Sequence, residues 1–287
     1  MKKLLLAALI AVALLLACCV MVNADGPEGG VPEWVEGWED QQVIVLKTGA
    51  GYSHPPSWDW RDVEGQDYVS PIKSQGNCGS CTSFAVVAAI EARYRIALGK
   101  AIDLSEAFLF FCNDRTCKYG AALETLLRAM ADTGTVDEGC YPYSTYPICI
   151  PCADWQAHLV SIPGWRVTTN PEEMKHEIAA SGPILATFTV YSDFWGYSGG
   201  VYHHTEEGTR RGGHAVAIVG YDDVRGCWII KNSWGTGWGE GGWGYVGYGE
   251  VGIDNLMYIP FMPYVYRIFL PVIMRRQVGE VQDAGPR

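Results

Sequence analysis

The chain has 287 residues and a formal net charge of −11 at pH 7. This charge excludes nucleic acid and anionic membrane surfaces as expected partners, because both bind clusters of Lys and Arg that the sequence lacks. The length allows one large domain or two packed lobes. With 34 glycines, 11 tryptophans and 16 tyrosines, we expect tight turns and aromatic packing.

The N-terminal segment 1–24 has the pattern of an export signal. Two lysines precede an apolar run over residues 4–22, and cleavage would follow Ala24. Two alternatives stay open: lipid attachment at Cys18, and an uncleaved anchor, since a run of about 19 apolar residues can span a membrane. All three place the rest of the chain outside the cytoplasm.

The next segment, residues 25–54, is rich in glycine, proline, acidic residues and tryptophan. We interpret it as a short pro-segment or linker. From Pro55 the composition becomes that of a packed domain, which we expect over residues 55–262. The tail 263–287 has an apolar core interrupted by charge and proline, so we expect a partly ordered tail, with a strap against the domain or a sorting signal as alternatives.

Helices are predicted first within this domain. The run 79–98 is apolar almost all round in its first half, which predicts a buried central helix with Cys81 at its start. Further helices are expected at about 105–112 and 121–132. A fourth should begin at Pro171, because asparagine precedes this proline and two glutamates follow it.

Strands are predicted in the second half. Short β-branched and aromatic runs between glycine turns indicate strands at 184–192, 214–221, 227–232 and 243–249. Helices followed by antiparallel strands predict an α+β protein of two lobes. We expect the active groove between the lobes.

Eight cysteines follow the N-terminal segment: Cys78, Cys81, Cys112, Cys117, Cys140, Cys149, Cys152 and Cys227. Outside the cytoplasm most of them should form disulfides. The C-x-x-C pair at 78–81 could be a redox couple, half of a zinc site, or a nucleophile beside a structural cysteine.

The spacing to two later motifs favours the nucleophile. His214 in GGHAVAIVGY follows Cys81 by 133 residues, and Asn232 in KNSWG follows it by 151, near the roughly 130–150 residues expected after a papain-type cysteine. With PSWDWRDVEG at 56–65 and SQGNCGSC at 74–81, the domain resembles the papain family of cysteine peptidases. This resemblance implies a helical N-terminal lobe, an antiparallel β-barrel-like C-terminal lobe and a groove between them.

The resemblance also implies roles for individual residues. Cys81 would be the nucleophile, since a helix N-terminus and the imidazolium of His214 both favour its thiolate. Asn232 would orient that imidazole, and Trp234 would shield their hydrogen bond from water. The side chain of Gln75 and the backbone N–H of Cys81 would stabilise the oxyanion.

Substrate contacts and one disulfide are implied in the same way. The resemblance pairs Cys78 with Cys117, which removes the redox interpretation. The residues expected to contact substrate are Gly79, Tyr119, Gly120, Ala122, Ala186, Gly213, Ala215 and Trp234. The small alanines favour a bulky apolar side chain two residues before the scissile bond.

The sequence departs from the family pattern at two positions near the site. Thr82 stands where an aromatic residue usually follows the nucleophile. We expect this change to alter stability or groove shape without abolishing activity. Tyr119 stands where relatives commonly have glycine, which leaves substrate binding on the unprimed side open. The short segment before the domain also lacks the long amphipathic helices of the usual inhibitory propeptide.

No metal or cofactor is expected. His203 and His204 are adjacent, and neighbours on a strand point to opposite faces, so we interpret them as exposed loop residues. Cys149 and Cys152 have no partner pair with zinc spacing, and we expect disulfides there. Their connectivity stays open, with Cys227 as the expected unpaired cysteine.

These observations predict an exported cysteine peptidase, a monomer that cleaves proteins or peptides internally. It would be secreted or otherwise extracytoplasmic, with the lipid anchor at Cys18 as an alternative. Three rival functions are a catalytically idle papain-like binding domain, a transpeptidase that uses the same acyl-enzyme, and a zinc-stabilised structural protein.

Overall fold

The computed structural model describes residues 52–262, and the structural statements below concern that range. The chain divides into two units, residues 1–40 and 41–287, of which the first lies wholly outside the described residues. The predicted signal peptide, nearly all of the pro-segment and the C-terminal tail also lie outside them. Between residues 52 and 262, no helix is long and apolar enough to cross a bilayer.

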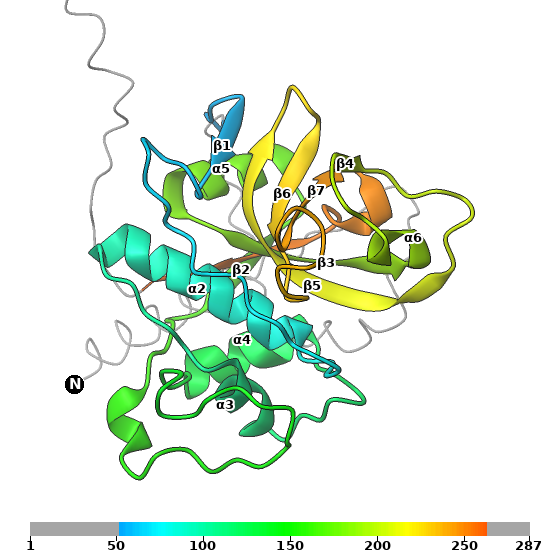
Figure 1. Ribbon diagram of the computed structural model, residues 1–287. Helices are drawn as coiled ribbons and strands as arrows, with labels where there is room; N and C mark the ends of the chain where they lie inside the picture. The colour runs from blue at the N-terminus through cyan, green and yellow to red at the C-terminus, as the bar shows by residue number, and fades with distance from the viewer. Residues whose placement is uncertain (1–51, 263–287) are drawn as a thin grey trace, which may run out of the picture. The chain divides into compact units, whose positions relative to one another are not determined.

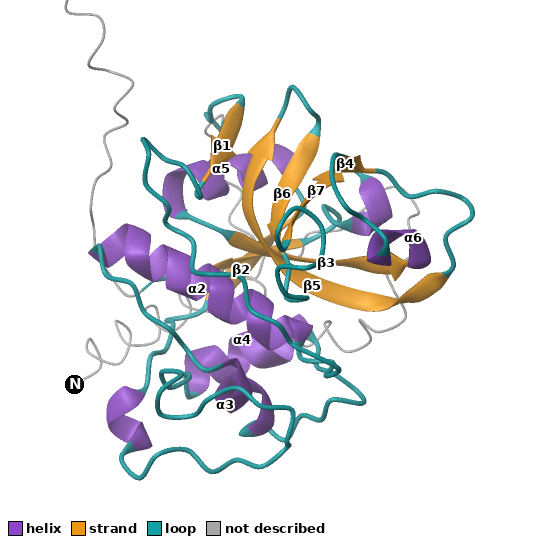
Figure 2. Ribbon diagram, viewed as in Figure 1, coloured by secondary structure: helices purple, strands orange, loops and turns teal. Residues whose placement is uncertain are grey.

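The central helix α2 (Cys81–Leu98) lies between the sheet and two shorter helices, α3 (Glu106–Phe111) and α4 (Leu123–Asp132), as Figures 1 and 2 show. Every residue from Thr82 to Arg93 is buried. This explains the absence of a polar face in its first half, since a helix packed on both sides needs none. The helix ends at Gly99, which is left-handed at φ 69° and donates its N–H to the Arg95 carbonyl.

The predicted caps of two other helices are present. Ser105 accepts a hydrogen bond from the Phe108 N–H at the start of α3. Asn170 accepts one from the Glu172 N–H at the start of α5 (Pro171–Ser181).

Three short helical segments were not predicted, because they are too brief to show a period: η2 (Trp155–His158), α6 (Ser192–Trp195) and η3 (Glu250–Gly252).

Eight strands form one open sheet, in the order β2-β8-β3-β5-β6-β7-β4, with β1 paired to β5. The strands are β1 (Ser57–Asp59), β2 (Trp165–Thr168), β3 (Ile184–Tyr191), β4 (Val201–Tyr202), β5 (Arg210–Asp222), β6 (Cys227–Lys231), β7 (Trp243–Gly247) and β8 (Met257–Pro260). All pairs are antiparallel except β4 with β7. The α+β prediction is confirmed, but the predicted barrel-like lobe is an open sheet.

Three disulfides fasten the helical part: Cys78–Cys117, Cys112–Cys149 and Cys140–Cys152. The first is the pair that the resemblance implies, and the other two settle the open connectivity. Cys81 and Cys227 are free, as expected. The zinc alternative is wrong for the C-x-x-C pair at 149–152, because both of its sulfurs are bound in disulfides.

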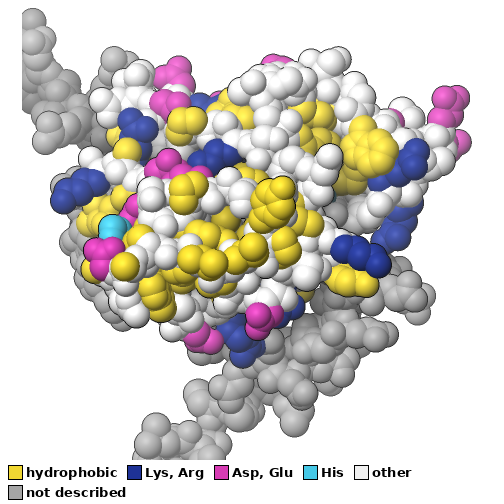
Figure 3. Space-filling model, turned by 60° about the horizontal axis from the view of Figure 1, so that its bottom comes forward, with side chains coloured by type: hydrophobic (Ala, Val, Ile, Leu, Met, Phe, Trp, Pro, Cys, Tyr) yellow, Lys and Arg dark blue, Asp and Glu magenta, His cyan; other side chains and the backbone are white. Residues whose placement is uncertain are grey.

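The Cys140–Cys152 disulfide closes the loop 140–152, and the Cys112–Cys149 disulfide joins this loop to the end of α3. The loop nevertheless exposes Tyr146, Ile148 and Ile150. Figure 3 turns the lower, helical side of Figure 1 toward the viewer and shows hydrophobic side chains gathered across that face. Because these exposed side chains do not pack into the core, burial does not fix the conformation of the loop. The disulfides restrict its conformation instead.

A cluster of buried charges joins the helices to the sheet. Lys73 contacts Asp103 at 2.7 Å, Glu106 of α3 at 2.9 Å and Glu91 of α2 at 3.6 Å. Lys231 of β6 reaches the same cluster through Ser70. Burial alone would lower the pKa of Lys73, but the carboxylates of Glu91 and Glu106 raise it above the ordinary value. Lys73 is therefore a cation held in place by two buried carboxyl groups, and burial raises the pKa of one of them, Glu106, to about 8.

We predict that Lys73→Met destabilises the domain by about 3–5 kcal/mol, because it leaves Glu91 and Glu106 buried without their cation. Urea unfolding followed by tryptophan fluorescence measures the change. Lys100→Met, at an exposed position just after α2, serves as the matched control and should change stability by less than about 0.5 kcal/mol. Equal effects of the two substitutions would contradict a structural role for the cluster.

Candidate active site

Cys81 is the first residue of α2 and is half-buried. Burial raises the pKa of its thiol, while the backbone N–H groups of Ala215, Thr82 and Cys81 itself act in the opposite direction. Two of these N–H groups belong to the first turn of α2, and the third follows His214 directly in β5. The fold therefore surrounds the sulfur with backbone donors from both the helix and the sheet.

His214 lies on β5, opposite Phe188 of β3, and only 5% of its surface is exposed. Its Nε2 is 2.8 Å from the Asn232 Oδ1, and the ring of Trp234 packs over it at 4.7 Å between centroids. Burial lowers the pKa of His214 to about 4, against the hydrogen bond to Asn232, which raises it. Without a neighbouring negative charge, the imidazole of His214 is therefore neutral at pH 7.

The hydrogen bonds around Asn232 fix which nitrogen of His214 carries the proton. Asn232 Oδ1 also accepts the backbone N–H of Ser233 at 2.8 Å, so this atom is the amide oxygen. An oxygen can only accept, and His214 must therefore donate from Nε2. Its Nδ1 is left as the basic nitrogen.

Gln75 is buried, and its side-chain amide is also fixed in orientation. Its Oε1 accepts from the Ser233 hydroxyl at 2.6 Å, and its Nε2 donates to the Cys78 carbonyl at 2.6 Å. A primary amide has two N–H groups, so one donor remains after the bond to Cys78. The backbone N–H of Gln75 is bonded to the Ser233 carbonyl at 2.8 Å.

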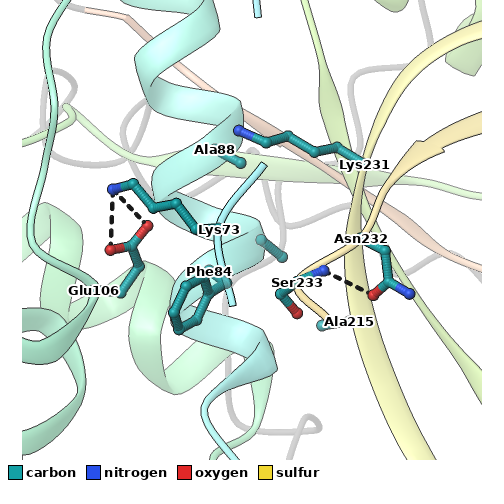
Figure 4. A pocket seen from close by; sticks show the side chains of 9 residues that line it. Lys73, Phe84, Ala88, Glu106, Ala215, Lys231, Asn232 and Ser233 are labelled. Atoms are coloured by element: carbon teal, nitrogen blue, oxygen red, sulfur yellow. Dashed lines mark hydrogen bonds and ion pairs between the residues drawn. The ribbon is translucent and has the colours of Figure 1, made fainter. Parts of the chain in front are cut away.

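Ser233 joins the two halves of the site. Its backbone N–H holds Asn232 and its hydroxyl holds Gln75. Sequence reasoning did not single out Ser233, although the NSWG motif contains it. Figure 4 shows Ser233 bonded to Asn232 on one side of a small cavity of about 10 Å³, and Lys73 paired with Glu106 on the other. Phe84, Ala85, Ala88, Ala215 and Lys231, which also line this cavity, are buried.

The two predicted glycines near Cys81 meet at a close backbone contact. Gly79 donates its N–H to the Cys117 carbonyl at 2.9 Å, and a Cβ on Gly79 would lie 2.8 Å from that oxygen. Gly120 faces Gly79 with φ at 66°, a conformation that favours glycine. Neighbouring Tyr119 is 80% exposed.

The other predicted substrate contacts fall into two groups. Ala122 and Gly213 are exposed, and Trp234 is half-buried. Ala186 and Ala215 are 0% and 2% exposed, because they lie on paired strands β3 and β5 in the core. Their predicted contact with a substrate side chain stays a prediction.

Thr82 is buried beside the site, with 5% of its surface exposed. Its hydroxyl has no hydrogen-bond partner within the described range, and neither does the Nδ2 of Asn232. His203 and His204 were interpreted as exposed loop residues; His203 is exposed, whereas His204 is half-buried, and each contacts a different carboxylate. His203 is bonded to Glu250, and His204 to Asp193.

Comparison with known proteins identifies the family of the chain. Residues 54–261 match the family model described as papain family cysteine protease. The chain is 37% identical over 228 residues to "Cathepsin B-like CP3" of Giardia intestinalis, covering 71% of this chain and 72% of that protein. It is 35% identical over 201 residues to pro-cathepsin H of Mus musculus, covering 66% of this chain and 59% of that one.

Solved structures give the same result. A digestive procathepsin L2 proteinase from the larval midgut of Tenebrio molitor has a TM-score of 0.64 and 32% identity, with 73% of this chain and 69% of that chain covered. A cysteine protease of Carica candamarcensis, solved in complex with E-64, has a TM-score of 0.60 and 30% identity, with coverages of 73% and 100%. The chain belongs to the papain family of cysteine proteases.

We predict that the pKa of His214 depends on the Cys81 thiol. In Cys81→Ala the imidazole has no thiolate partner, so its pKa should lie near 4. In the native chain the negative charge of the Cys81 thiolate should keep the proton on the imidazole and raise the pKa of His214 well above the ordinary value of 6.5. NMR titration of histidine-labelled protein measures both.

The same variant should lose stability as the pH falls from about 6.5 to about 4. In this window the unfolded chain binds a proton that the folded variant does not yet bind. Identical pKa values of His214 in both proteins would show that no ion pair with Cys81 forms.

Proposed function

We propose that this chain is an exported cysteine peptidase that hydrolyses peptide bonds through an acyl-enzyme on Cys81. The proposal rests on the groups that surround the Cys81 thiol. Cys81 begins the buried helix α2 and lies beside the Ala215 N–H, while the preceding His214 is held by Asn232 with Nδ1 free as a base.

The first half of the reaction forms the thioester. The Cys81 Sγ gives its proton to His214 Nδ1, and the thiolate attacks the carbonyl carbon of the scissile bond. The oxyanion that forms would accept hydrogen bonds from the second N–H of the Gln75 amide and from the Cys81 backbone N–H. When the C–N bond breaks, the imidazolium gives the proton to the leaving amine.

The second half releases the acid. Water gives a proton to His214 as its oxygen attacks the thioester carbonyl, and the same donors stabilise the second oxyanion. The C–S bond then breaks, and the imidazolium returns the proton to Cys81. Asn232 keeps the ring oriented throughout by accepting the Nε2 proton.

Peptide and protein substrates follow from membership of the family. We propose internal cleavage, because the sequence has no obvious inserted loop that would block one end of a groove. The half-buried Gly120, set against Gly79 without side chains between them, supports close approach of an extended substrate backbone.

Export is supported by two independent features. The pattern of residues 1–24 is that of a signal, and the described domain carries three disulfides, which persist in oxidising compartments. We propose a secreted or otherwise extracytoplasmic monomer. Lipid attachment at Cys18 or retention of the apolar run would instead join it to a membrane.

Two other functions use the same domain. If the chain is a catalytically idle binding domain, it should cleave no peptide. The observation that favours this alternative is Thr82, which replaces the usual aromatic residue after Cys81. A transpeptidase predicts that an added amine appears in the product, since an amine would then replace water in the second step. Mass analysis of the products separates transfer from hydrolysis.

We predict that Cys81→Ala abolishes cleavage of a mixed peptide library under mild reductant at pH 5–7, because the acyl-enzyme cannot form. Cys227→Ala is the matched control, since Cys227 is the other free cysteine and is buried in β6 away from the site. The control should cleave at the native rate. Cleavage by Cys81→Ala, or silence of the native protein after removal of residues 25–54, would contradict the proposal.

We also predict that the exported protein begins after Ala24. Intact-mass measurement of material from the extracellular or periplasmic fraction distinguishes the routes. A mass that begins at Asp25 supports cleavage, and a lipid adduct on Cys18 supports the lipid anchor. Accumulation of the full-length chain in the cytoplasm would contradict export.

A further inference from the structure

Tyr143 lies in the disulfide-closed loop 140–152, which no step of the proposed mechanism uses. Its hydroxyl donates to the backbone carbonyl of Gln75 at 2.9 Å and lies 2.7 Å from the hydroxyl of Ser80. A phenol has one proton, so Ser80 must be the donor in the second bond. One hydroxyl thus contacts the residue before the nucleophile and the glutamine of the oxyanion hole.

The bond to Tyr143 changes what Ser80 does. Ser80 occupies the N-cap position of α2 and is fully buried, yet its side chain makes no capping hydrogen bond. A serine at this position ordinarily accepts an N–H from the first turn of its helix. Here the Thr82 N–H stays available and is directed at the Cys81 thiol.

The loop holds Tyr143 firmly. Its backbone N–H is bonded to Glu138 at 2.6 Å, and its ring meets Phe84 of α2 edge to face at 4.8 Å. The Cys140–Cys152 disulfide closes the loop around it. The position of the hydroxyl is therefore set by packing, independently of the two hydrogen bonds it makes.

We propose that Tyr143 is a positioning residue for the oxyanion hole: its hydroxyl fixes the backbone of Gln75 and draws the Ser80 hydroxyl away from the start of α2. The inference rests on the proposed function, because it assigns a support to the same site. It gives the loop 140–152 a role in the reaction through a residue that touches no substrate.

Tyr143→Phe tests this inference, since it removes the hydroxyl and keeps the ring on Phe84. We expect kcat to fall about 5- to 10-fold, as for loss of one or two neutral hydrogen bonds, with KM within about 2-fold. The inhibition constant of a peptide aldehyde, whose thiol adduct uses the oxyanion hole, should rise by the same factor. Alkylation by iodoacetamide well above the thiol pKa needs no oxyanion hole and should keep its rate.

Tyr141→Phe is the matched control. It removes a hydroxyl of the same loop that donates to the Ile148 carbonyl, away from Gln75 and Ser80. If both variants change kcat and aldehyde affinity equally, or if Tyr143→Phe slows alkylation as much as kcat, the inference is wrong. A thermal melt of both variants identifies any loss that is merely structural.

A double-mutant cycle of Tyr143→Phe with Gln75→Ala tests whether Tyr143 affects kcat through Gln75. Because Tyr143 acts in part through Gln75, the combined loss should be smaller than the product of the two single losses. Independent, multiplying losses would overturn the inference. The proposed function fails separately, if Gln75→Ala alone has no effect or if the native protein does not cleave peptides.

Discussion

The burial of α2 between the sheet and the other helices is the constraint on which the site depends. Because both sides of this helix are packed, its first residue has a fixed position, and Cys81 is that residue. The strand that α2 packs against, β5, carries His214, so the same contact brings the proposed nucleophile and the proposed base to one place. A group of charged residues also joins α2 to the sheet: Glu91 of α2 pairs with Lys73, and Lys231 of β6 reaches the group through Ser70.

Burial has opposite effects on the pKa values of the two proposed catalytic groups, Cys81 and His214. It raises the pKa of the Cys81 thiol and lowers the pKa of His214, so each group alone favours its neutral form. In the proposed mechanism, a proton transfer from Cys81 to His214 creates two opposite charges that would stabilise each other inside the same low-dielectric site. The donors around the sulfur, and the Asn232 oxygen behind the imidazole, then face charges of the correct sign.

The elements with strong local signals were predictable from the sequence. Three local patterns predicted their helices correctly: the apolar run of α2, the serine cap of α3 and the Asn170-Pro171 start of α5. Strands β1, β2, β4 and β8 have two to four residues, which is too short for a period, and partners distant in sequence define them. The hydrogen bonds of Ser233 to Gln75 and of Tyr143 to Gln75 were not predictable either, because they join residues that are 158 and 68 positions apart in the sequence.

The central claim is a covalent intermediate on one sulfur. Acid quenching of the purified domain during turnover of a peptide ester, followed by intact-mass and peptide mapping, tests it most directly. The account predicts an added mass equal to the acyl part of the substrate, located on the peptide that contains Cys81. Turnover with no adduct on Cys81, or with the adduct on Cys227, would contradict it.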